Sequence, residues 1–407
     1  MFILENEKTK VPIKIWLQSI NDIEEGCLQQ AYNLSSLPFL HKWVALMPDT
    51  HLGKGMPIGA IIATDDVIIP NAVGVDIGCG MSFFSTDILV DEIAPIQTGN
   101  GHLVQAIAGD ILRNIPVGRK RHNSIQKSPA LDMAKQEMEK YENTPHLVDE
   151  INMAYFYTGT LGGGNHFIEL QRDEKGYLCV MIHSGSRNLG KQICDHFNHM
   201  AKDTPQHNVP QDIDLPHLDV SSNIGKQYIN WMNLAGNFAK ENRDHMIAAV
   251  KNILERYLTK YTNISYTIKE EINAHHNYAA LETHFDKQVW VHRKGAISAK
   301  EGEMGIIPGA MGSFSYIVKG LGNKESFFSS SHGAGRLYSR TTAMANFTIE
   351  EVMHDLKQQG VVLGKHNKKD VAQEARFAYK DINQVMKDQE DLVLPAKKLK
   401  TIAVVKG

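Results

Sequence analysis

The sequence predicts an α+β protein with mixed sheets, because its strand-like and helix-like segments do not alternate regularly along the chain. Short apolar or alternating runs bounded by Pro, Gly and Asp are typical of strands. One long segment, residues 228–257, repeats its apolar positions at helical spacing. We find no internal repeat, low-complexity linker or break in composition, so we expect one compact domain over residues 1–407.

The individual elements follow from these patterns. Strands are predicted at residues 42–48 (KWVALMP), 59–64 (GAIIAT), 66–70 (DVIIP), 177–182 (YLCVMI), 287–294 (KQVWVHRK) and 400–407 (KTIAVVKG). Helical spacing links Ile193, Phe197, Met200 and Ala201, and it recurs in the longer segment at Ile229, Met232, Phe238, Met246, Val250, Ile253 and Tyr257. The polar stretch 202–223 is the best candidate for a loop, or for an insertion within the domain.

Composition and charge exclude several classes of protein. The chain has 407 residues, of which 42% are hydrophobic and 22% charged, so it is typical of globular proteins with a large core. A net charge of −3 excludes a generally basic nucleic-acid coat, so a nucleic acid would have to be held by a local patch. No apolar run approaches the ~20 residues of a membrane helix, and the start lacks the apolar core of a signal peptide. The four cysteines also have no disulfide or CxxC spacing. Together these observations lead us to expect a cytoplasmic protein without a membrane partner.

Candidate metal ligands cluster where the predicted strands end. The segment VGVDIGCGM places Asp76 and Cys79 three residues apart in a glycine-rich turn. A carboxylate and a thiolate so close can converge on one divalent ion, and loops at strand ends hold binding side chains on a rigid scaffold. Further candidates are Asn165, His166 and Glu169 in LGGGNHFIEL, His183 in MIHSGSR, and His275, His276 and Asn277 in EEINAHHNY.

Each candidate also has a purely structural interpretation. A lone buried cysteine such as Cys79 is usually a small apolar side chain, and a single histidine at a strand end is more often hydrogen-bonded than a ligand. His275 and His276 point to opposite faces of an extended chain, so at most one of them is a ligand. Together, thiolate, carboxylate and imidazoles suit Mn, Fe, Co or Zn better than Mg or Ca. The residues alone favour a transition-metal site and a structural cluster about equally.

Two glycine-rich segments indicate a phosphate or nucleotide site. Residues 306–323, IIPGAMGSFSYIVKGLGN, carry glycines and serines that can cradle a phosphate. Residues 329–340, SSSHGAGRLYSR, place His332 beside Gly333 and Gly335, where a phosphate loop of the common NTPase kind has a lysine. A histidine there can attack phosphorus and form a phosphoramidate that relays a nucleotidyl group. The alternatives are that His332 is a metal ligand or a general base, and that residues 306–323 are only tight turns.

A series of motifs, in order along essentially the whole chain, resembles the RtcB family of GTP-dependent RNA-splicing ligases. The motifs are MPDTHLGKG, VGVDIGCGM, GNHFIE, HSGSR, AHHNY, RKGAISA, PGAMGSFSYIVKGLGN, SSSHGAGR and the final VVKG. The resemblance implies one compact α+β domain. It also implies an enzyme of tRNA splicing or RNA repair that uses GTP and Mn²⁺ to join RNA ending in a 2′,3′-cyclic phosphate or 3′-phosphate to RNA beginning with a 5′-hydroxyl. In that reaction His332 would receive GMP and pass it to the RNA 3′-phosphate before the 5′-hydroxyl displaces it.

The resemblance also assigns roles to individual residues. It implies two Mn²⁺ ions per chain, one held by Asp76, Cys79 and His166 and the other by Cys79, His183 and His276, with the thiolate as a bridge. It implies a GMP site formed by Asn165, His166, Phe167, Ile168, Glu169, His276, Asn277, Pro308, Gly309, Ala310, Met311, Ser315, His332, Gly333, Ala334, Gly335 and Lys406. Ala274 and Gly163 stand where some relatives have cysteine and threonine, and neither supplies a ligand. We expect Glu169 to face the donors of guanine and Lys406 to face its O6.

RNA contacts are predicted less directly than the nucleotide site. The most basic stretch, residues 113–127 (RNIPVGRKRHNSIQK), is either a phosphate-binding loop or an ordinary solvated one. Arg187 and Arg336 lie inside site motifs, so they are better candidates for holding terminal phosphates. The resemblance leaves open an archease-like activating partner. A metal-dependent phosphoesterase and a non-catalytic RNA-binding or metal-storing protein are the rival functions, and His332 beside an intact GMP set favours the ligase.

Overall fold

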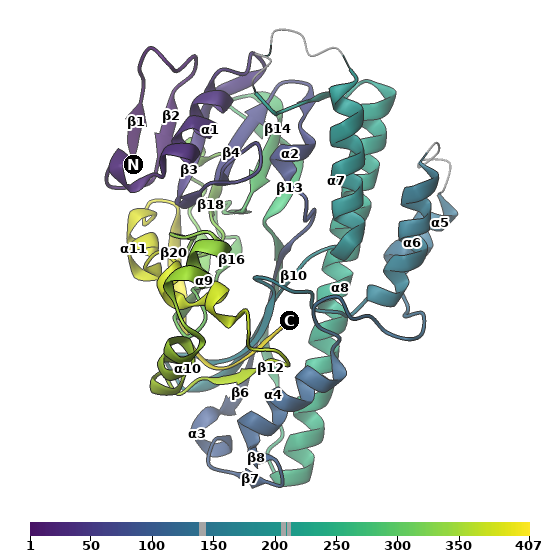
Figure 1. The fold of residues 1–407 in the computed structure, drawn as a ribbon, viewed down its shortest axis with the longest axis vertical. Coiled ribbons are helices and arrows are strands. Elements are labelled where there is room, and N and C mark those ends of the chain that lie inside the picture. The colour runs from purple at the N-terminus through teal and green to yellow at the C-terminus, as the bar shows by residue number, and fades with distance from the viewer. Residues whose placement is uncertain (138–143, 205–208, 210–212) are drawn as a thin grey trace.

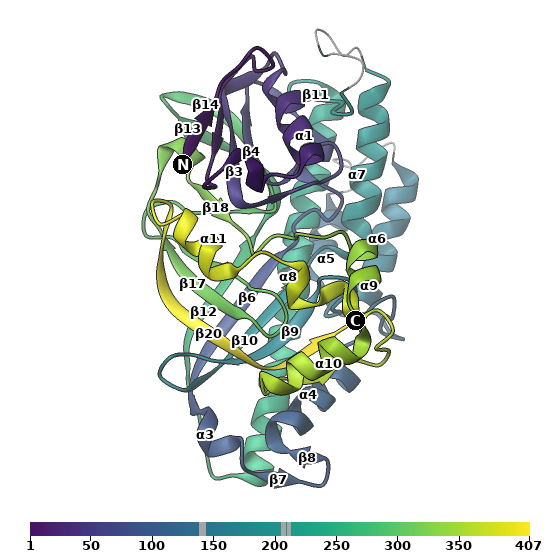
Figure 2. The same cartoon turned by 60° about the vertical axis from the view of Figure 1, so that its left-hand side comes forward.

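Two β-sheets form the centre of the molecule, and helices pack against them (Figure 1, Figure 2). The computed structural model describes residues 1–137, 144–204, 209 and 213–407. The strands pair mostly antiparallel, and the helices are not interleaved regularly with them. This arrangement confirms the α+β prediction.

The strands of each sheet come from distant parts of the chain. The six-stranded sheet has the order β1 (Phe2–Leu4), β2 (Ile13–Ile15), β3 (Leu40–His51), β4 (Ile58–Thr64), β14 (Lys287–Lys294) and β13 (Asn277–His284). The larger sheet has the order β12 (Ile268–His275), β6 (Gly80–Leu89), β10 (Tyr177–Ser184), β9 (Phe167–Arg172), β20 (Val393–Lys406), β17 (Phe314–Gly320) and β16 (Met304–Ile307), with β19 (Val362–Gly364) parallel to β20. Two-stranded pairs join β5 (Val67–Ile68) to β11 (Leu218–Asp219), β15 (Ala296–Ser298) to β18 (Ser329–Ser331), and β7 (Gln97–Thr98) to β8 (Gly101–His102).

The helices include one that runs most of the length of the molecule, α8 (Asn223–Tyr261), beside α7 (Arg187–Lys202) (Figure 1). The side chain of Ser222 caps α8 by accepting a hydrogen bond from Gly225 N. The others are α1 (Glu25–Ser35), α2 (Pro70–Val73), α3 (Val90–Ile93), α4 (Leu103–Asn114), α5 (Pro129–Gln136), α6 (Pro145–Tyr157), α9 (Arg340–Asn346), α10 (Ile349–Gln358) and α11 (Ile382–Asp388). Among the described residues, none of these helices has the length and apolar character needed to cross a membrane.

The predicted elements agree with this arrangement. The six predicted strands are found in β3, β4, β5, β10, β14 and β20, and the two helical patterns are found in α7 and α8. The predicted loop 202–223 begins at the last residue of α7 and ends at the first residue of α8, but its residues 205–208 and 210–212 lie outside the described part of the chain. Its residues Leu218–Asp219 form the short strand β11.

The larger sheet separates an apolar core from the face that carries the candidate site. Because successive side chains of a strand point to opposite faces, Ile168 of β9 and Ile182 of β10 enter a core shared with α4 and α8. Phe167 and Met181, one position away, enter a second core closed by residues of α10. Figure 1 shows strands of this sheet with α8 on one side and α10 on the other. The alternation therefore decides which residues of β9, β10 and β20 can reach a ligand.

Candidate functional site

The register of β9, β10 and β20 places predicted metal-binding and nucleotide-binding residues on one face of the larger sheet. His183 of β10 lies opposite Phe167 of β9, and Phe167 lies opposite Lys406 of β20. Two residues further along β9, Glu169 lies opposite Met181 of β10 and Val404 of β20. These residues all point away from the core with α4 and α8, so a ligand on this face meets all three strands at once.

The turn between α2 and β6 supplies two more functional groups, Asp76 and Cys79. Cys79 N donates to Asp76 O over 3.0 Å, which closes the turn. Gly78, inside it, has φ +73° and lies against α8, where a Cβ would come within 2.8 Å of Gly236 Cα. Glycine is required here by both the backbone conformation and the close approach. The tight contact with α8 fixes the position of the Cys79 sulfur.

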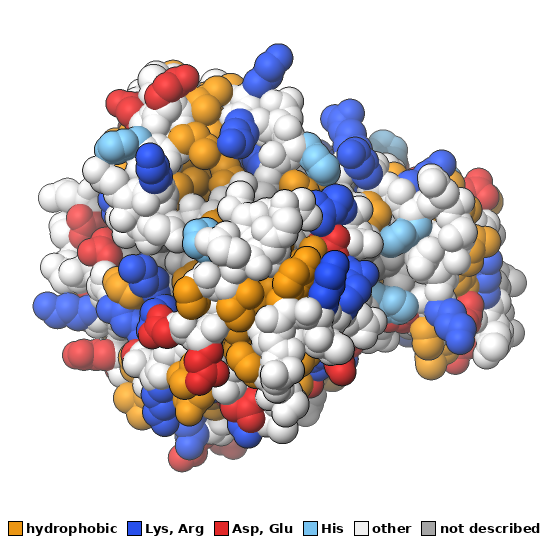
Figure 3. Space-filling view, turned by 90° about the horizontal axis from the view of Figure 1, so that it is seen from below, with side chains coloured by type: hydrophobic (Ala, Val, Ile, Leu, Met, Phe, Trp, Pro, Cys, Tyr) orange, Lys and Arg blue, Asp and Glu red, His pale blue; other side chains and the backbone are white. Residues whose placement is uncertain are grey.

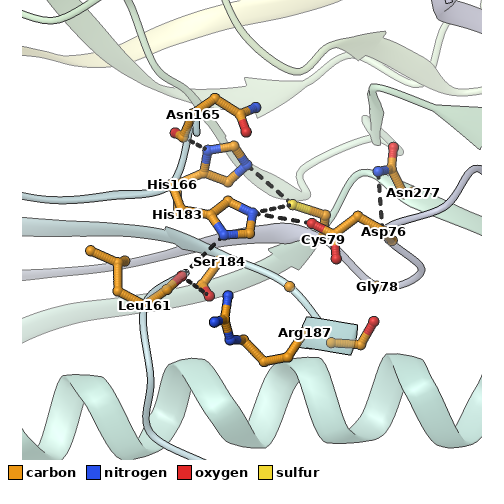
Figure 4. A network of polar contacts seen from close by, with 12 residues as sticks. Asp76, Gly78, Cys79, Leu161, Asn165, His166, His183, Ser184, Arg187 and Asn277 are labelled. Carbon is orange, nitrogen blue, oxygen red and sulfur yellow. Dashed lines mark hydrogen bonds and ion pairs between the residues drawn. The ribbon is translucent and has the colours of Figure 1, made fainter. Parts of the chain in front are cut away.

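Two groups of possible metal ligands share the sulfur of Cys79. Figure 4 shows this sulfur beside Asp76, His166 and His183. The sulfur lies 3.4 Å from His166 Nε2 and 3.3 Å from His183 Nε2. Asp76 Oδ2 is 3.1 Å from His166 Nε2, and His276 Nε2 is 3.3 Å from His183 Nε2. The groups are Asp76, Cys79 and His166, and Cys79, His183 and His276, with Cys79 in both.

The ring protons of two of these histidines are held on the far side of the ring. His166 Nδ1 lies 3.0 Å from Leu161 O, and His183 Nδ1 lies 3.0 Å from Asn165 O. Carbonyl oxygens only accept, so each Nδ1–H donates and each Nε2 offers a lone pair to the cluster. Lone pairs therefore outnumber hydrogens around the Cys79 sulfur. A divalent transition metal would satisfy this set of thiolate, imidazole and carboxylate donors, so the residues present fit one.

Burial keeps two histidines of the cluster in the neutral form that binds a metal. It lowers the pKa of His183 and of His276 well below the usual value, so both imidazoles are neutral. Burial acts to raise the pKa of Asp76, but its polar contacts, among them a hydrogen bond from the Cys79 thiol, outweigh burial and the carboxyl stays ionised. Burial and the Asp76 charge both raise the pKa of the Cys79 thiol. A bound divalent cation favours the thiolate instead, so loss of the thiol proton is coupled to metal binding.

Arg243 on α8 supports the cluster from behind, and the sequence patterns did not reveal it. Its guanidinium is fully buried and donates to Gly78 O and Ser184 O over 2.9 Å each. It also lies 3.2 Å from His275 Nδ1, whose other neighbour is Gly78 O at 2.9 Å. His276 thus faces the metal ligands and His275 faces the scaffold. The signal available in the sequence was an arginine within the buried stripe of a long helix.

A cavity of about 740 Å³ adjoins the cluster. This volume lies within the range of small-molecule sites. The predicted residues that line it are Asn165, Phe167, Glu169, His183, His276, Pro308, Gly309, Ala310, Met311, His332, Gly333, Ala334, Gly335 and Lys406. Residues that were not predicted for the nucleotide site also line it, among them His51, Arg336, Tyr338, Arg340, Glu374 and Tyr379.

His332 stands between the metal cluster and this cavity, and Asp49 holds it there. The His332 and His276 ring centroids are 4.7 Å apart. His332 Nδ1 donates to Asp49 Oδ2 over 2.7 Å, and the same oxygen accepts from His332 N at 3.0 Å and Gly333 N at 3.3 Å. Asp49 is fully buried in β3. With the proton fixed on Nδ1, Nε2 is the free nucleophilic nitrogen.

The glycine of the His332 loop is needed for this contact. Gly335 has φ +74°, and a Cβ there would lie 2.3 Å from Asp49 O. Only glycine lets the two backbones approach so closely. The sequence patterns did not single out Asp49 because it lies 283 positions from His332 and neither the strand pattern nor the spacing links them.

Glu169 of β9 and Lys406 of β20 line the cavity side by side with the residues described above. Glu169 Oε2 accepts from Gln171 Nε2 at 2.6 Å and from Thr401 Oγ1 at 2.9 Å. Burial raises the pKa of Glu169 to about 7, although these hydrogen bonds and the Lys406 charge lower it. Lys406 Nζ lies 3.1 Å from Glu374 Oε2. A carboxyl group and an ammonium group thus flank the same end of the cavity.

Some predicted residues lie beside the cavity and do not line it. The side chain of Ile168 packs in the core on the opposite face of the sheet. Ser315 Oγ accepts from Gly309 N, and Asn277 Nδ2 donates to Asp76 O, so both brace neighbouring loops. Arg187 donates to Gly118 O and Thr160 Oγ1. Arg336, which does line the cavity, is bound by Glu374, Tyr379 and Gln373 O.

A ligand set for transition metals beside a cavity with an oriented histidine is an arrangement from which an enzyme site can be built. The model of the family described as tRNA-splicing ligase RtcB matches residues 30–407. The chain is 38% identical to the RNA-splicing ligase RtcB of Escherichia coli strain K12, with 97% of each chain covered. It is 31% identical to the tRNA-splicing ligase RtcB of Thermococcus kodakarensis, covering 94% of this chain and 91% of that protein. The chain belongs to the RtcB family.

Removing the shared thiolate should disturb both groups of metal ligands. After loading with Mn²⁺ and desalting, Cys79→Ala is expected to lose both ions, because Cys79 belongs to both groups. His276→Ala should lose only the ion of its own group. Metal content by ICP-MS is the measurement, and His354→Ala, an exposed histidine on α10, is the control that should retain the parent content. Two tightly held ions in Cys79→Ala would rule out the bridge.

Proposed function

We propose that this protein is a GTP- and Mn²⁺-dependent RNA ligase that joins 3′-phosphate or 2′,3′-cyclic phosphate ends to 5′-hydroxyl ends. One observation carries the proposal: His332, with its Nδ1 held by Asp49, lies between the two ligand groups and a cavity of nucleotide size. Membership of a family of RNA-splicing ligases supports the substrate class. The ligand set around Cys79 supports the metal.

The proposed reaction passes a guanylyl group through His332. Mn²⁺ ions held by the two groups would neutralise phosphate charge and orient the phosphates. His332 Nε2 attacks the α-phosphorus of GTP, and the bond to pyrophosphate breaks. An oxygen of the RNA 3′-phosphate then attacks this phosphorus and releases His332. Finally the 5′-hydroxyl oxygen attacks the RNA phosphate, GMP leaves, and the RNA phosphate becomes the new linkage. A cyclic end is first hydrolysed to the 3′-phosphate.

Asp49 serves the first two steps of this scheme. Its Oδ2 accepts the Nδ1 proton of His332 and two backbone N–H groups of the loop, so the ring can neither rotate nor change tautomer. The carboxylate charge also stabilises the imidazole as its Nε2 bonds to phosphorus and the ring becomes more positive. Asp49 is a positioning residue, because it acts on the nucleotide through His332.

Glu169 and Lys406 are proposed to recognise guanine. Guanine offers N1–H and an exocyclic NH₂ as donors and O6 as an acceptor, which a carboxylate and an ammonium match. Glu169 Oε2 accepts hydrogen bonds from Gln171 and Thr401. Its Oε1 accepts none from the described residues, so that oxygen could accept from guanine. Adenine presents the opposite pattern at its N1 and C6 positions, so it would leave these buried groups unmatched.

Replacing His332 should separate the early steps from the last one. His332→Ala is expected to abolish covalent labelling of the protein by GTP radiolabelled at the α-phosphate, and to abolish joining. It should still seal RNA that already carries a 3′-pyrophosphoryl-guanosine, because the nucleophile acts only before that point. His354→Ala, an exposed histidine on α10, is the control. Persistent labelling of His332→Ala, seen after denaturing electrophoresis, would remove the assigned role.

Asp49→Asn should slow guanylylation of His332 by at least about tenfold, because it removes the carboxylate that orients the ring and stabilises its positive charge. Asn can still accept a hydrogen bond but carries no charge, so Asp49→Ala should lose more than Asp49→Asn. Single-turnover labelling measures both rates. Sealing of preformed 3′-pyrophosphoryl-guanosine RNA should stay near the parent rate. Equal losses in the labelling and sealing reactions would show a general structural defect.

The base preference should depend on pH through Glu169. Its pKa is raised to about 7, so the carboxylate that pairs with guanine is lost as pH falls through that value. Preference for GTP over ATP should therefore decrease below about pH 7 in the parent. Glu169→Gln should weaken GTP use by about tenfold to a hundredfold, as for one charge-assisted hydrogen bond, and flatten the pH dependence.

Lys406→Met is the companion test, since it removes the group expected at O6 and leaves the metal ligands intact. It should narrow the GTP-over-ATP preference while Mn²⁺ content is unchanged. Glu350→Gln, an exposed carboxyl on α10, controls for charge. A GTP-over-ATP ratio equal to the parent's in both Glu169→Gln and Lys406→Met would exclude these residues from base recognition.

A further inference from the structure

A second hollow, of about 400 Å³, lies on the surface near the end of β20. Its lining comes from two loops and the last residue of the sequence: Val117, Arg119, Lys120, Lys365, His366, Asn367, Asp370 and Gly407. A narrow space lined by Lys365, Asp370, Glu374 and Lys406 lies between this hollow and the main cavity. We call the hollow the outer groove. It shares Lys365 and Asp370 with the narrow space, which shares Glu374 and Lys406 with the nucleotide cavity.

Two cations of the outer groove have no anionic partner in the part of the chain that the structure describes. Lys365 is neutralised locally, since it lies 3.3 Å from Asp370 Oδ1 and donates to Gly407 O. Arg119 and Lys120 are exposed, and no ion pair or side-chain hydrogen bond is recorded for either within the described residues. The charged residues that line the groove are three cations, Arg119, Lys120 and Lys365, and one anion, Asp370. Figure 3 shows Lys and Arg side chains interspersed with Asp and Glu over much of one face. The groove is therefore a local excess of positive charge on a chain whose net charge is −3.

The backbone ties these cations to the loop that carries a metal ligand. Gly118 N donates to Gly162 O over 2.7 Å, and Arg187 donates to Gly118 O over 2.6 Å. Gly162 lies in the segment between Leu161 and His166, and a Cβ on it would come within 2.4 Å of His166 Nδ1. Arg119 and Lys120 follow Gly118 directly in the sequence, so the hydrogen bonds of Gly118 hold them near the loop that carries His166. A strand that runs from the metal cluster to the outer groove would meet them there.

We propose that the outer groove binds backbone phosphates of the RNA strand that ends in the 3′-phosphate, a few nucleotides before that end. The proposal rests on the ligase function above, because that function requires the terminal phosphate of the RNA to lie at the metal cluster. Unpaired Arg and Lys on a groove are the usual means of holding a polynucleotide backbone without reading its sequence. The exposed Lys368 and Lys369, next to the lining residues 365–367, add to the charge at the opposite wall.

The test compares RNA lengths. The double variant Arg119→Ser/Lys120→Ser should bind an RNA of about 16 nucleotides with a 3′-phosphate roughly tenfold more weakly than the parent, without GTP. Binding of a dinucleotide with the same end should be unchanged, because it does not reach the groove. The slope of log affinity against log salt should be shallower by about 1.4 for the long RNA, at about 0.7 for each single-strand phosphate contact.

Matched variants separate charge from structure. Lys10→Ser/Lys319→Ser removes two exposed cations away from the groove and should leave binding of the long RNA unchanged. Arg119→Lys/Lys120→Arg keeps the charge and should retain parent affinity. Unchanged affinity of Arg119→Ser/Lys120→Ser for the long RNA would overturn the proposal, and so would an equal loss for the short RNA. Labelling of His332 by GTP in the same variant should equal that of the parent. If GTP does not label the parent protein, the proposed ligase function is wrong. The comparison of affinities for the long and the short RNA then still tests whether the groove binds RNA.

Discussion

Lone pairs converging on the sulfur of Cys79 impose the constraint on which the rest of the structure depends. Asp76, His166 and His183 face one another or the sulfur at 3.1 to 3.4 Å without enough hydrogens to satisfy these contacts. Such an arrangement persists only where the surrounding fold holds it, because acceptors left facing each other repel. The carbonyl groups that fix the rings, the tight Gly78 turn and the buried Arg243 provide that restraint. A cation converts the repulsion into coordination, so metal binding should also stabilise the fold locally.

One sheet face connects this cluster to the other functions of the site. His183, Phe167 and Lys406 lie side by side on three neighbouring strands, so the distance from the metal ligands to the proposed base-recognition end is set by interstrand spacing. Strand spacing varies little, which makes the face a fixed platform for a ligand of definite length. His332 approaches this platform from a different sheet region, through the pairing of β18 with β15, and Asp49 of β3 holds its ring. The site is thus assembled where elements of both large sheets meet.

The sequence allowed correct prediction of those features that depend on local pattern. The predicted strands and the long helix reflect alternating and helical periodicity, which burial on one face enforces. The structure brings the two predicted sets together as groups that could hold a metal ion, and their role as ligands stays a prediction. The residues alone did not decide between His275 and His276; the resemblance did. Asp49 and Arg243 could not be predicted, because each acts through contacts with residues far away in the chain and looks like an ordinary strand or helix residue. The guanidinium groups of Arg187 and Arg336, expected to hold phosphates, have protein partners here, a competition that no spacing rule reveals.

The position of β20 in the larger sheet has a consequence for biosynthesis. This strand lies between β9 and β17 and pairs with both, yet its residues 393–406 are translated after almost all the others. Until they leave the ribosome, β9 and β17 have unpaired edges and the cavity lacks the wall formed by Val404 and Lys406. A nascent chain that has already formed α8 and both groups of metal ligands therefore cannot complete the nucleotide pocket. Chaperones can bind the exposed strand edges during that interval. A chain truncated before β20 would keep these edges open, and they would mark it as incompletely folded.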